Sequence, residues 1–197
     1  MWEPDRKYRE ITSLIDRYDY FDGYWQAWKY VEQIREILEK DFTPNYELSK
    51  MTRDTVAAIS SENAVFIGVR RGDYSKEIKH YGSFSSQYYQ DAMRYIAERS
   101  DNPVFYVFSN DIEWCKKSIK WGKHNVVFRE KEQQTDDFEE LQLMTLCKHA
   151  IIVNSSFNWW GAALIQNQNK IVCCPAQWWL DNKPIDIIPP NWIRISI

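Results

Sequence analysis

Glycine and cysteine are both scarce in this sequence of 197 residues. With only six glycines, a phosphate site would have to rely on side chains or helix ends rather than on a glycine-rich loop. The cysteines show no C-x-x-C spacing, so neither a zinc site nor a disulfide framework is favoured. We interpret them as four reduced thiols, at Cys115, Cys147, Cys173 and Cys174.

An excess of one charge and long apolar runs are also missing. Lys and Arg number 25 and Asp and Glu 28, for a formal net charge of −3, which argues against a nucleic-acid-binding protein. No segment approaches the roughly 20 apolar residues of a membrane span, and the first residues lack the apolar core of a signal peptide. We therefore expect a cytoplasmic protein without a transmembrane span, and leave open peripheral contact with the inner face of a membrane.

Aromatic residues are abundant, with ten tryptophans, and the chain divides into two parts. Residues 1–60 are polar, aromatic and helical in pattern, and we interpret them as a helical lead-in. Apolar residues at three-to-four spacing predict an amphipathic helix over 24–38. Pro44 ends it, and Asn45 is the expected cap of a second helix that runs through Ser60.

From residue 61 to residue 197, short apolar runs alternate with helical stretches. Strands without internal alternation that are separated by helices predict an α/β fold, with a doubly wound parallel sheet covered on both faces. We expect five strands, over 64–69, 104–108, 125–128, 150–153 and 171–174. Helices are expected between them over 85–99, 111–120, 136–148 and 157–166. The tail after Pro175 is expected to be an irregular segment ending near Trp192.

Three polar clusters follow predicted strands, at the strand ends where doubly wound sheets bind ligands. The first contains Arg70, Arg71 and Asp73 directly after a buried strand. A guanidinium group is always charged and presents a planar fork suited to phosphate oxygens, which favours an anion site. The alternative is a pair of surface arginines with Asp73 as their structural partner.

The other two clusters are also typical of helix caps. Ser109 and Asp111 follow the second strand and either cap a helix or contact a ribose or base. The third cluster opens a helix whose backbone N–H groups can bind an anion, and contains Asn154, Ser155, Ser156 and Phe157. The alternative is that Ser155 or Ser156 only caps the helix. Together, the three clusters predict a site for a phosphate-bearing nucleotide.

The three motifs also resemble a known family in their order. Arg-Arg-Gly-Asp-Tyr at 70–74, Phe-Ser-Asn-Asp-Ile-Glu-Trp at 108–114 and Asn-Ser-Ser-Phe-Asn-Trp-Trp-Gly-Ala at 154–162 are similar to motifs of the GDP-fucose-dependent α-1,2-fucosyltransferases, glycosyltransferase family 11. The likeness runs from about Gly23 to the end of the chain. It implies a Rossmann-like donor-binding domain of a GT-B enzyme over 61–197, after the lead-in, with an amino-terminal acceptor domain missing. In the family a histidine usually stands where this chain has Gly68.

The resemblance implies transfer of fucose from GDP-fucose to a galactose-type hydroxyl of a glycan, with inversion. Arg70 and Arg71 would stabilise the leaving diphosphate, with Asp73 orienting them or serving as a base. The 154–157 turn would hold the other oxygens, and no D-x-D motif is present, so we expect no metal and no other cofactor. Two alternatives stay open: a non-catalytic nucleotide-sugar-binding module, and a related transferase that uses another nucleotide sugar.

Overall fold

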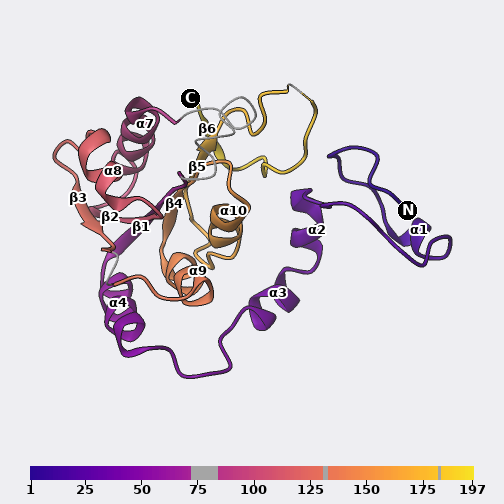
Figure 1. The fold of residues 1–197 in the computed structure, drawn as a ribbon, viewed down its shortest axis with the longest axis horizontal. Coiled ribbons are helices and arrows are strands. Elements are labelled where there is room, and N and C mark those ends of the chain that lie inside the picture. The colour runs from indigo at the N-terminus through magenta and orange to yellow at the C-terminus, as the bar shows by residue number, and fades with distance from the viewer. Residues whose placement is uncertain (72–83, 131–132, 182) are drawn as a thin grey trace.

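A six-stranded parallel sheet forms the centre of the computed structural model, which describes residues 1–71, 84–130, 133–181 and 183–197 (Figure 1). The strand order is β3-β2-β1-β4-β5-β6, and every neighbouring pair is parallel. The strands are β1 (Asn63–Val69), β2 (Pro103–Ser109), β3 (Asn125–Phe128), β4 (His149–Ile151), β5 (Val172–Pro175) and β6 (Ile193–Ile195). The predicted α/β fold with a parallel sheet is confirmed.

Helices connect the strands and cover the sheet. They are α1 (Thr12–Ile15), α2 (Trp28–Gln33), α3 (Arg35–Asp41), α4 (Lys50–Ser61), α7 (Ser86–Ala97), α8 (Ile112–Ser118), α9 (Asp137–Leu146) and α10 (Ser156–Ala163). A side-chain oxygen of the residue before α7, α8, α9 and α10 accepts a hydrogen bond from a first-turn N–H group. For Asp111 and Ser155 this is the capping role that we gave as one of two alternatives. Among the described residues, no helix has both the length and the apolar character needed to cross a bilayer.

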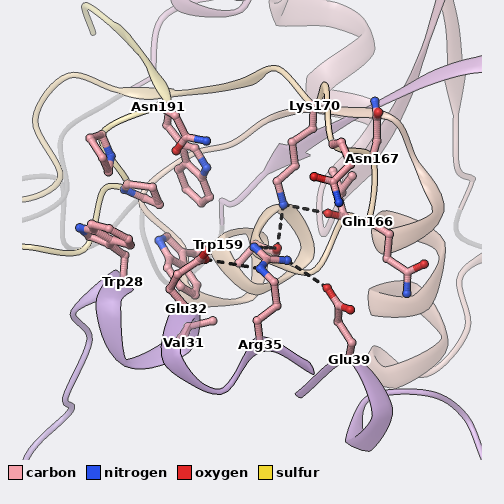
Figure 2. A pocket seen from close by; sticks show the side chains of 16 residues that line it. Trp28, Val31, Glu32, Arg35, Glu39, Trp159, Gln166, Asn167, Lys170 and Asn191 are labelled. Atoms are coloured by element: carbon pink, nitrogen blue, oxygen red, sulfur yellow. Dashed lines mark hydrogen bonds and ion pairs between the residues drawn. The ribbon is translucent and has the colours of Figure 1, made fainter. Parts of the chain in front are cut away.

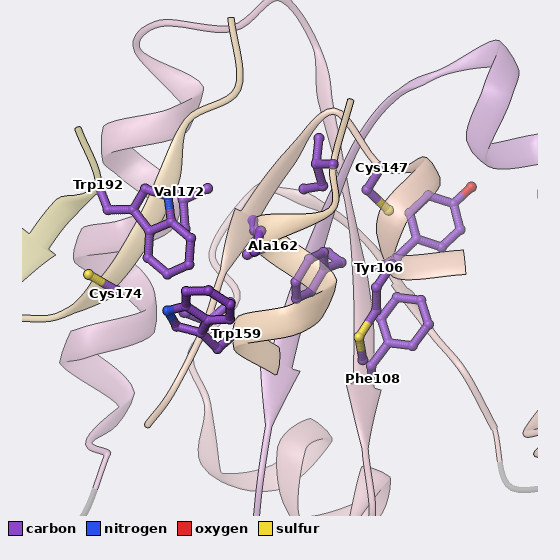
Figure 3. Close-up of a cluster of buried hydrophobic side chains, with 14 of the residues drawn as sticks. Tyr106, Phe108, Cys147, Trp159, Ala162, Val172, Cys174 and Trp192 are labelled. Atoms are coloured by element: carbon purple, nitrogen blue, oxygen red, sulfur yellow. The ribbon is translucent and has the colours of Figure 1, made fainter. Parts of the chain in front are cut away.

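The two faces of the sheet carry separate apolar clusters, because successive side chains of a strand point in opposite directions. On β1, Ala64 and Phe66 face one cluster, while Val65 and Ile67 face the other. The first cluster includes residues of α9, α10 and the carboxyl-terminal tail (Figure 3). The second includes residues of α7 and α8. In Figure 1 these two pairs of helices lie on opposite sides of the strands.

The strand order reverses between β1 and β4, which is where a sheet of this kind opens a crevice for a ligand. From β1 the chain winds through β2 to the edge at β3, then returns to the other side of β1 at β4. Arg70 follows the end of β1, and the 154–157 turn joins the segment after β4 to the first residues of α10. The topology therefore brings the first and third polar clusters to the same crevice.

The lead-in differs from its prediction at two points. The single helix expected over 24–38 is two helices, because Ile34 (φ −121°, ψ 22°) leaves helical geometry between α2 and α3. Each helix is tied to a different part of the domain. The N–H of Trp28 donates to the carbonyl of Asp186, and the ring of Phe42 stacks on Trp160.

The second lead-in helix also begins later than expected. Ser49, rather than Asn45, caps α4, with its Oγ accepting from the N–H of Thr52 at 3.2 Å. Glu139 of α9 accepts hydrogen bonds from the N–H and the hydroxyl of Ser49, at 2.8 and 2.7 Å. This contact with α9 selects the start of the helix, and local sequence alone does not contain it.

The carboxyl-terminal tail also departs from the irregular segment that we expected. After Trp192 the chain forms β6, which pairs in parallel with β5 from Cys173 opposite Ile193 to Pro175 opposite Ile195. Three residues are too few for a periodic signal, so the strand is defined by its neighbour in the sheet. The adjacent Cys173 and Cys174 point to opposite clusters as predicted, and all four cysteines are buried and free.

Candidate functional site

A cavity of about 410 Å³ lies at the carboxyl ends of β1 and β2, beside the start of α10. We call it the strand-end cavity. Arg70 after β1, Ser109 at the end of β2, and the turn at Ser155, Ser156 and Phe157 all line it. The position is the one that strand topology predicts for a ligand in a doubly wound sheet. The structure thus brings together residues from all three polar clusters.

The start of α10 gives the cavity its electrostatic character. Ser155 is buried and caps α10, with its Oγ accepting from the N–H of Asn158 at 3.5 Å. Ser156 is exposed at the first helical position and Phe157 is half-buried next to it. The first N–H groups of a helix have no partner within the helix, and the helix dipole adds positive potential there. Together with the guanidinium of Arg70, this end of the cavity favours an anion.

The two neighbouring arginines point to different surroundings. Arg71 lies with its guanidinium carbon 4.1 Å from the centre of the Trp114 ring, and its Nε is 3.6 Å from Oδ2 of Asp111. Its backbone N–H donates to Oδ1 of Asn110 at 2.9 Å. Arg71 is not among the residues that line the cavity, whereas Arg70 is. The structure therefore separates the pair into a cavity arginine and one held against α8.

The four remaining predicted site residues are each in a different situation. Ser109 lines the cavity, and its Oγ accepts from the N–H of Asp111 at 3.0 Å. Asp111 caps α8 through Trp114 and does not line the cavity. Asn154 is buried behind the turn, where its Nδ2 donates to the carbonyl of Trp178 at 3.0 Å and ties down the tail. Asp73 lies outside the described residues.

One wall of the cavity was missed by the sequence interpretation. It comes from the segment between β3 and α9 and from α9 itself, through Gln134, Thr135, Asp137 and Glu140. Gln134 Nε2 donates to the carbonyl of Ser109 at 3.1 Å and joins this wall to β2. A signal was available, because Gln134 and Thr135 also follow a predicted strand and precede a predicted helix, whose first turns contain Asp137 and Glu140.

A buried ion pair supports that wall. Arg129 is 3 % exposed, and its Nε donates to Oε2 of Glu140 at 3.2 Å. The N–H of Thr135 also donates to Glu140, at 3.1 Å. With its charge matched by Arg129, the Glu140 carboxylate adds little net negative potential to the cavity. Arg70 and the start of α10 supply positive potential to the cavity, and the carboxylate of Asp137 in its wall supplies negative potential.

The other end of α10 lies in a second cavity, of about 400 Å³ (Figure 2). We call it the helix-end cavity. There Lys170 Nζ donates to the carbonyls of Ala162, Ala163 and Ile165 at 3.0, 2.8 and 2.8 Å. Burial lowers the pKa of Lys170 to about 8, so the group is still mostly protonated at neutral pH. Cations at a helix carboxyl end stabilise the helix dipole, and Lys170 thereby supports the orientation of α10.

Arg35 of α3 reinforces the same helix end. One of its guanidinium nitrogens donates to the carbonyl of Ala163 at 3.0 Å. The same guanidinium forms ion pairs with Glu32 at 3.4 Å and Glu39 at 3.2 Å, as Figure 2 shows. The positive groups of the helix-end cavity are thus engaged by carbonyls and carboxylates. Within the described ranges, no three His, Cys, Asp or Glu side chains are grouped so that they could hold a metal ion.

Comparisons with known proteins show which enzymes this chain is similar to. The chain is 37% identical over 203 residues to an alpha-1,2-colitosyltransferase of Escherichia coli, covering 99% of this chain and 69% of the relative. It is 28% identical to the O-antigen biosynthesis glycosyltransferase WbnK of Escherichia coli, over 88% of this chain and 59% of the relative. It is 30% identical to galactoside alpha-(1,2)-fucosyltransferase 1 of Leontocebus fuscicollis, over 79% of this chain and 45% of the relative.

The chain therefore spans between 45% and 69% of the length of these relatives. The family described as Glycosyl transferase family 11 matches residues 5–196. That match begins ahead of Gly23, where we expected the likeness to start, so it includes most of the helical lead-in. With nearly the whole chain matched and the three motif clusters meeting at one sheet edge, the chain belongs to glycosyl transferase family 11.

Proposed function

We propose that this chain binds GDP-fucose in the strand-end cavity and transfers the fucosyl group, with inversion, to a galactose-type hydroxyl of a glycan. The observation that carries the proposal is the placement of Arg70 opposite the first turn of α10, in the crevice between β1 and β4. A relative named for galactoside α-(1,2)-fucosyl transfer, 30% identical to this chain, supports the choice of fucose and of a galactoside acceptor.

Arg70 and α10 would act on the leaving group. When the bond between the sugar and GDP breaks, negative charge builds on the terminal phosphate while the sugar takes on oxocarbenium character. Preorganised positive groups aimed at that phosphate lower the barrier, because they are already in place when the charge develops. The guanidinium of Arg70 would bind the phosphate oxygens, and the turn at 155–157 would hold the others through its N–H groups.

The neighbouring residues would position the donor or the groups that bind it. Arg71, held by Asp111 and Trp114, would fix the chain after β1 and add positive charge from outside the cavity. Ser109, at the end of β2, would contact the ribose or the base, with Asp111 as its support. Asn154 would keep the turn in place from its buried position. We assign Asp73 the orientation of the arginines rather than the role of general base.

Binding and turnover need separate tests, because a binding module would also hold the nucleotide. Calorimetry with GDP is expected to give one site, which UDP and CDP compete for only weakly. A donor-turnover assay with GDP-fucose and a galactoside acceptor is expected to release GDP. No binding of GDP would contradict the proposal, and binding without turnover would favour the non-catalytic alternative. Activity lost with a chelator and restored by a divalent cation would contradict the metal independence that we expect.

A second candidate donor is GDP-colitose. The relative named as an α-1,2-colitosyltransferase is 37% identical to this chain over 99% of it, a higher identity than the 30% of the fucosyltransferase. Colitose is fucose without the 3-hydroxyl, so the two donors differ in a single polar group. Turnover measured with each donor at the same concentration decides between them, and a kcat/KM at least tenfold higher with GDP-colitose would replace fucose in the proposal.

A further inference from the structure

Gly68 and Asn158 occupy one space between β1 and α10. A Cβ atom added to Gly68 would lie 2.4 Å from both Cγ and Oδ1 of Asn158, and 2.5 Å from its Nδ2. These separations are well inside van der Waals contact, so no side chain at position 68 is compatible with the present position of the Asn158 amide. The absence of a side chain at Gly68 is what lets the amide lie against the strand.

The amide of Asn158 is poorly matched by the protein around it. The residue is 5 % exposed and lines the strand-end cavity. Its Oδ1 is buried, and within the described part of the chain it has no hydrogen-bond partner. Buried polar atoms are nearly always paired, because leaving one unpaired destabilises the fold. An unpaired amide oxygen at the wall of a cavity is a place where a ligand group is expected.

The residues around Asn158 indicate which ligand group would bind its Oδ1. Asn158 lies in the first turn of α10, beside the residues that face Arg70. An amide oxygen only accepts hydrogen bonds, and so do the oxygens of an ionised diphosphate. The partner of Oδ1 is therefore a hydrogen-bond donor of the bound molecule, and hydroxyl groups are the most numerous donors of a nucleotide sugar.

We propose that Asn158 is a binding residue for the nucleotide-sugar donor, with its amide oxygen accepting a hydrogen bond from a hydroxyl of the ligand, and that Gly68 is needed because it leaves room for that amide. The proposal rests on the proposed function, since it places the donor in the strand-end cavity. Gly68 on β1 and Asn158 on α10 would form a pair in which the amide can bind the ligand only when position 68 has no side chain.

The first test removes the acceptor and keeps the shape. Asn158→Leu places two methyl groups where the amide oxygen and nitrogen are, and calorimetry then measures affinity for GDP and for GDP-fucose. We expect binding about tenfold weaker than in the wild type, the effect of one lost hydrogen bond. Asn169→Ala makes a similar polar-to-apolar change at an exposed loop residue and is expected to bind like the wild type.

The two ligands identify the hydroxyl. If both GDP and GDP-fucose bind more weakly to the Leu variant, the hydroxyl belongs to the nucleotide. If only GDP-fucose does, it belongs to the hexose. Unchanged affinity for both ligands, while the wild type binds them, would overturn this inference and leave the proposed function intact. A wild type that binds neither ligand would overturn both.

The second test examines the shared space. Gly68→Ala pushes the amide of Asn158 out of its position, and we expect a loss of affinity similar to that of Asn158→Leu. In the double variant Gly68→Ala, Asn158→Ala the added methyl group enters space already vacated, so binding should match that of Asn158→Ala alone. Losses that simply multiply in the double variant would contradict the pairing. Thermal unfolding of each variant without ligand verifies that the binding changes occur in folded protein.

Discussion

The two ends of α10 lie in cavities of similar size and carry opposite chemistry. At the amino end, Arg70 and the first turn of α10 both line the strand-end cavity of about 410 Å³. At the carboxyl end, in the helix-end cavity of about 400 Å³, Lys170 and Arg35 already bind the helix carbonyls. A cavity's volume therefore does not show what it binds. We assign the positive groups of the strand-end cavity to a ligand, whereas those of the helix-end cavity stabilise the fold.

Arg70→Ala is expected to have the largest effect on function. Removal of a preorganised positive group from the leaving phosphate should lower kcat/KM for GDP-fucose by about 10²–10³-fold, because the interaction strengthens as charge develops. Steady-state kinetics measure the change. The control is Arg17→Ala, which removes an exposed arginine from the lead-in. A variant that keeps wild-type turnover would show that the strand-end cavity does not stabilise the leaving group.

Lys170→Met tests the other end of α10 and should affect stability rather than binding. It removes the donor to three helix carbonyls, and we expect the free energy of unfolding to fall by about 2 kcal/mol. Urea denaturation measures that loss, with Lys117→Met on the exposed face of α8 as the matched control. GDP affinity of the folded variant should change by less than about threefold. An unchanged stability with a large loss of affinity would reverse the roles that we give to the two ends.

Arg71→Ala should weaken function less than Arg70→Ala does. Its guanidinium is held against Trp114 and Asp111, so its charge acts on the ligand only from a distance. We expect GDP affinity to fall by about fivefold, near 1 kcal/mol. Calorimetry on the two single variants compares them directly. A larger loss for Arg71→Ala than for Arg70→Ala would mean that Arg71 leaves Trp114 to bind the phosphates.

The smallest expected effect is a pH dependence of stability from His149. The ring is buried beside β5, with Nδ1 accepting from the N–H of Ile171 at 2.9 Å, and burial lowers the pKa of His149 below 6.5. As pH falls through 6.5 the unfolded chain takes up a proton before the folded chain does, so folding stability decreases. Urea denaturation at pH 7.5 and 5.5 should show a smaller decrease for His149→Gln. Equal decreases would contradict this assignment.

Much of the fold could be predicted because its signals are local. Buried strands such as 64–69 appear as continuous apolar runs, and the caps at Ser85 and Asp111 are ordinary helix starts. The failures occur where a distant contact decides. Glu139 selects Ser49 as the cap of α4, and β5 makes a strand of 193–195. The break at Ile34 likewise separates α2 and α3, which contact different parts of the domain.

The site could be located from the sequence but not resolved residue by residue. The rule that ligands bind at the ends of parallel strands predicted that Arg70, Ser109 and Ser155 lie at one site. All three line the strand-end cavity. That rule does not decide which of two adjacent arginines faces the cavity, since the outcome depends on Trp114 of another helix. The contact of Gly68 with Asn158 is also invisible in the sequence, because the residues lie far apart along the chain.

A crystal structure of this chain with GDP tests the central claim most directly. The account predicts the diphosphate between the Arg70 guanidinium and the N–H groups of the 155–157 turn, with the nucleoside along the ends of β1 and β2. The helix-end cavity should stay free of nucleotide, with Lys170 still bound to the carbonyls of α10. A diphosphate bound beside Lys170 and Arg35 instead, with nothing against Arg70, would contradict the account.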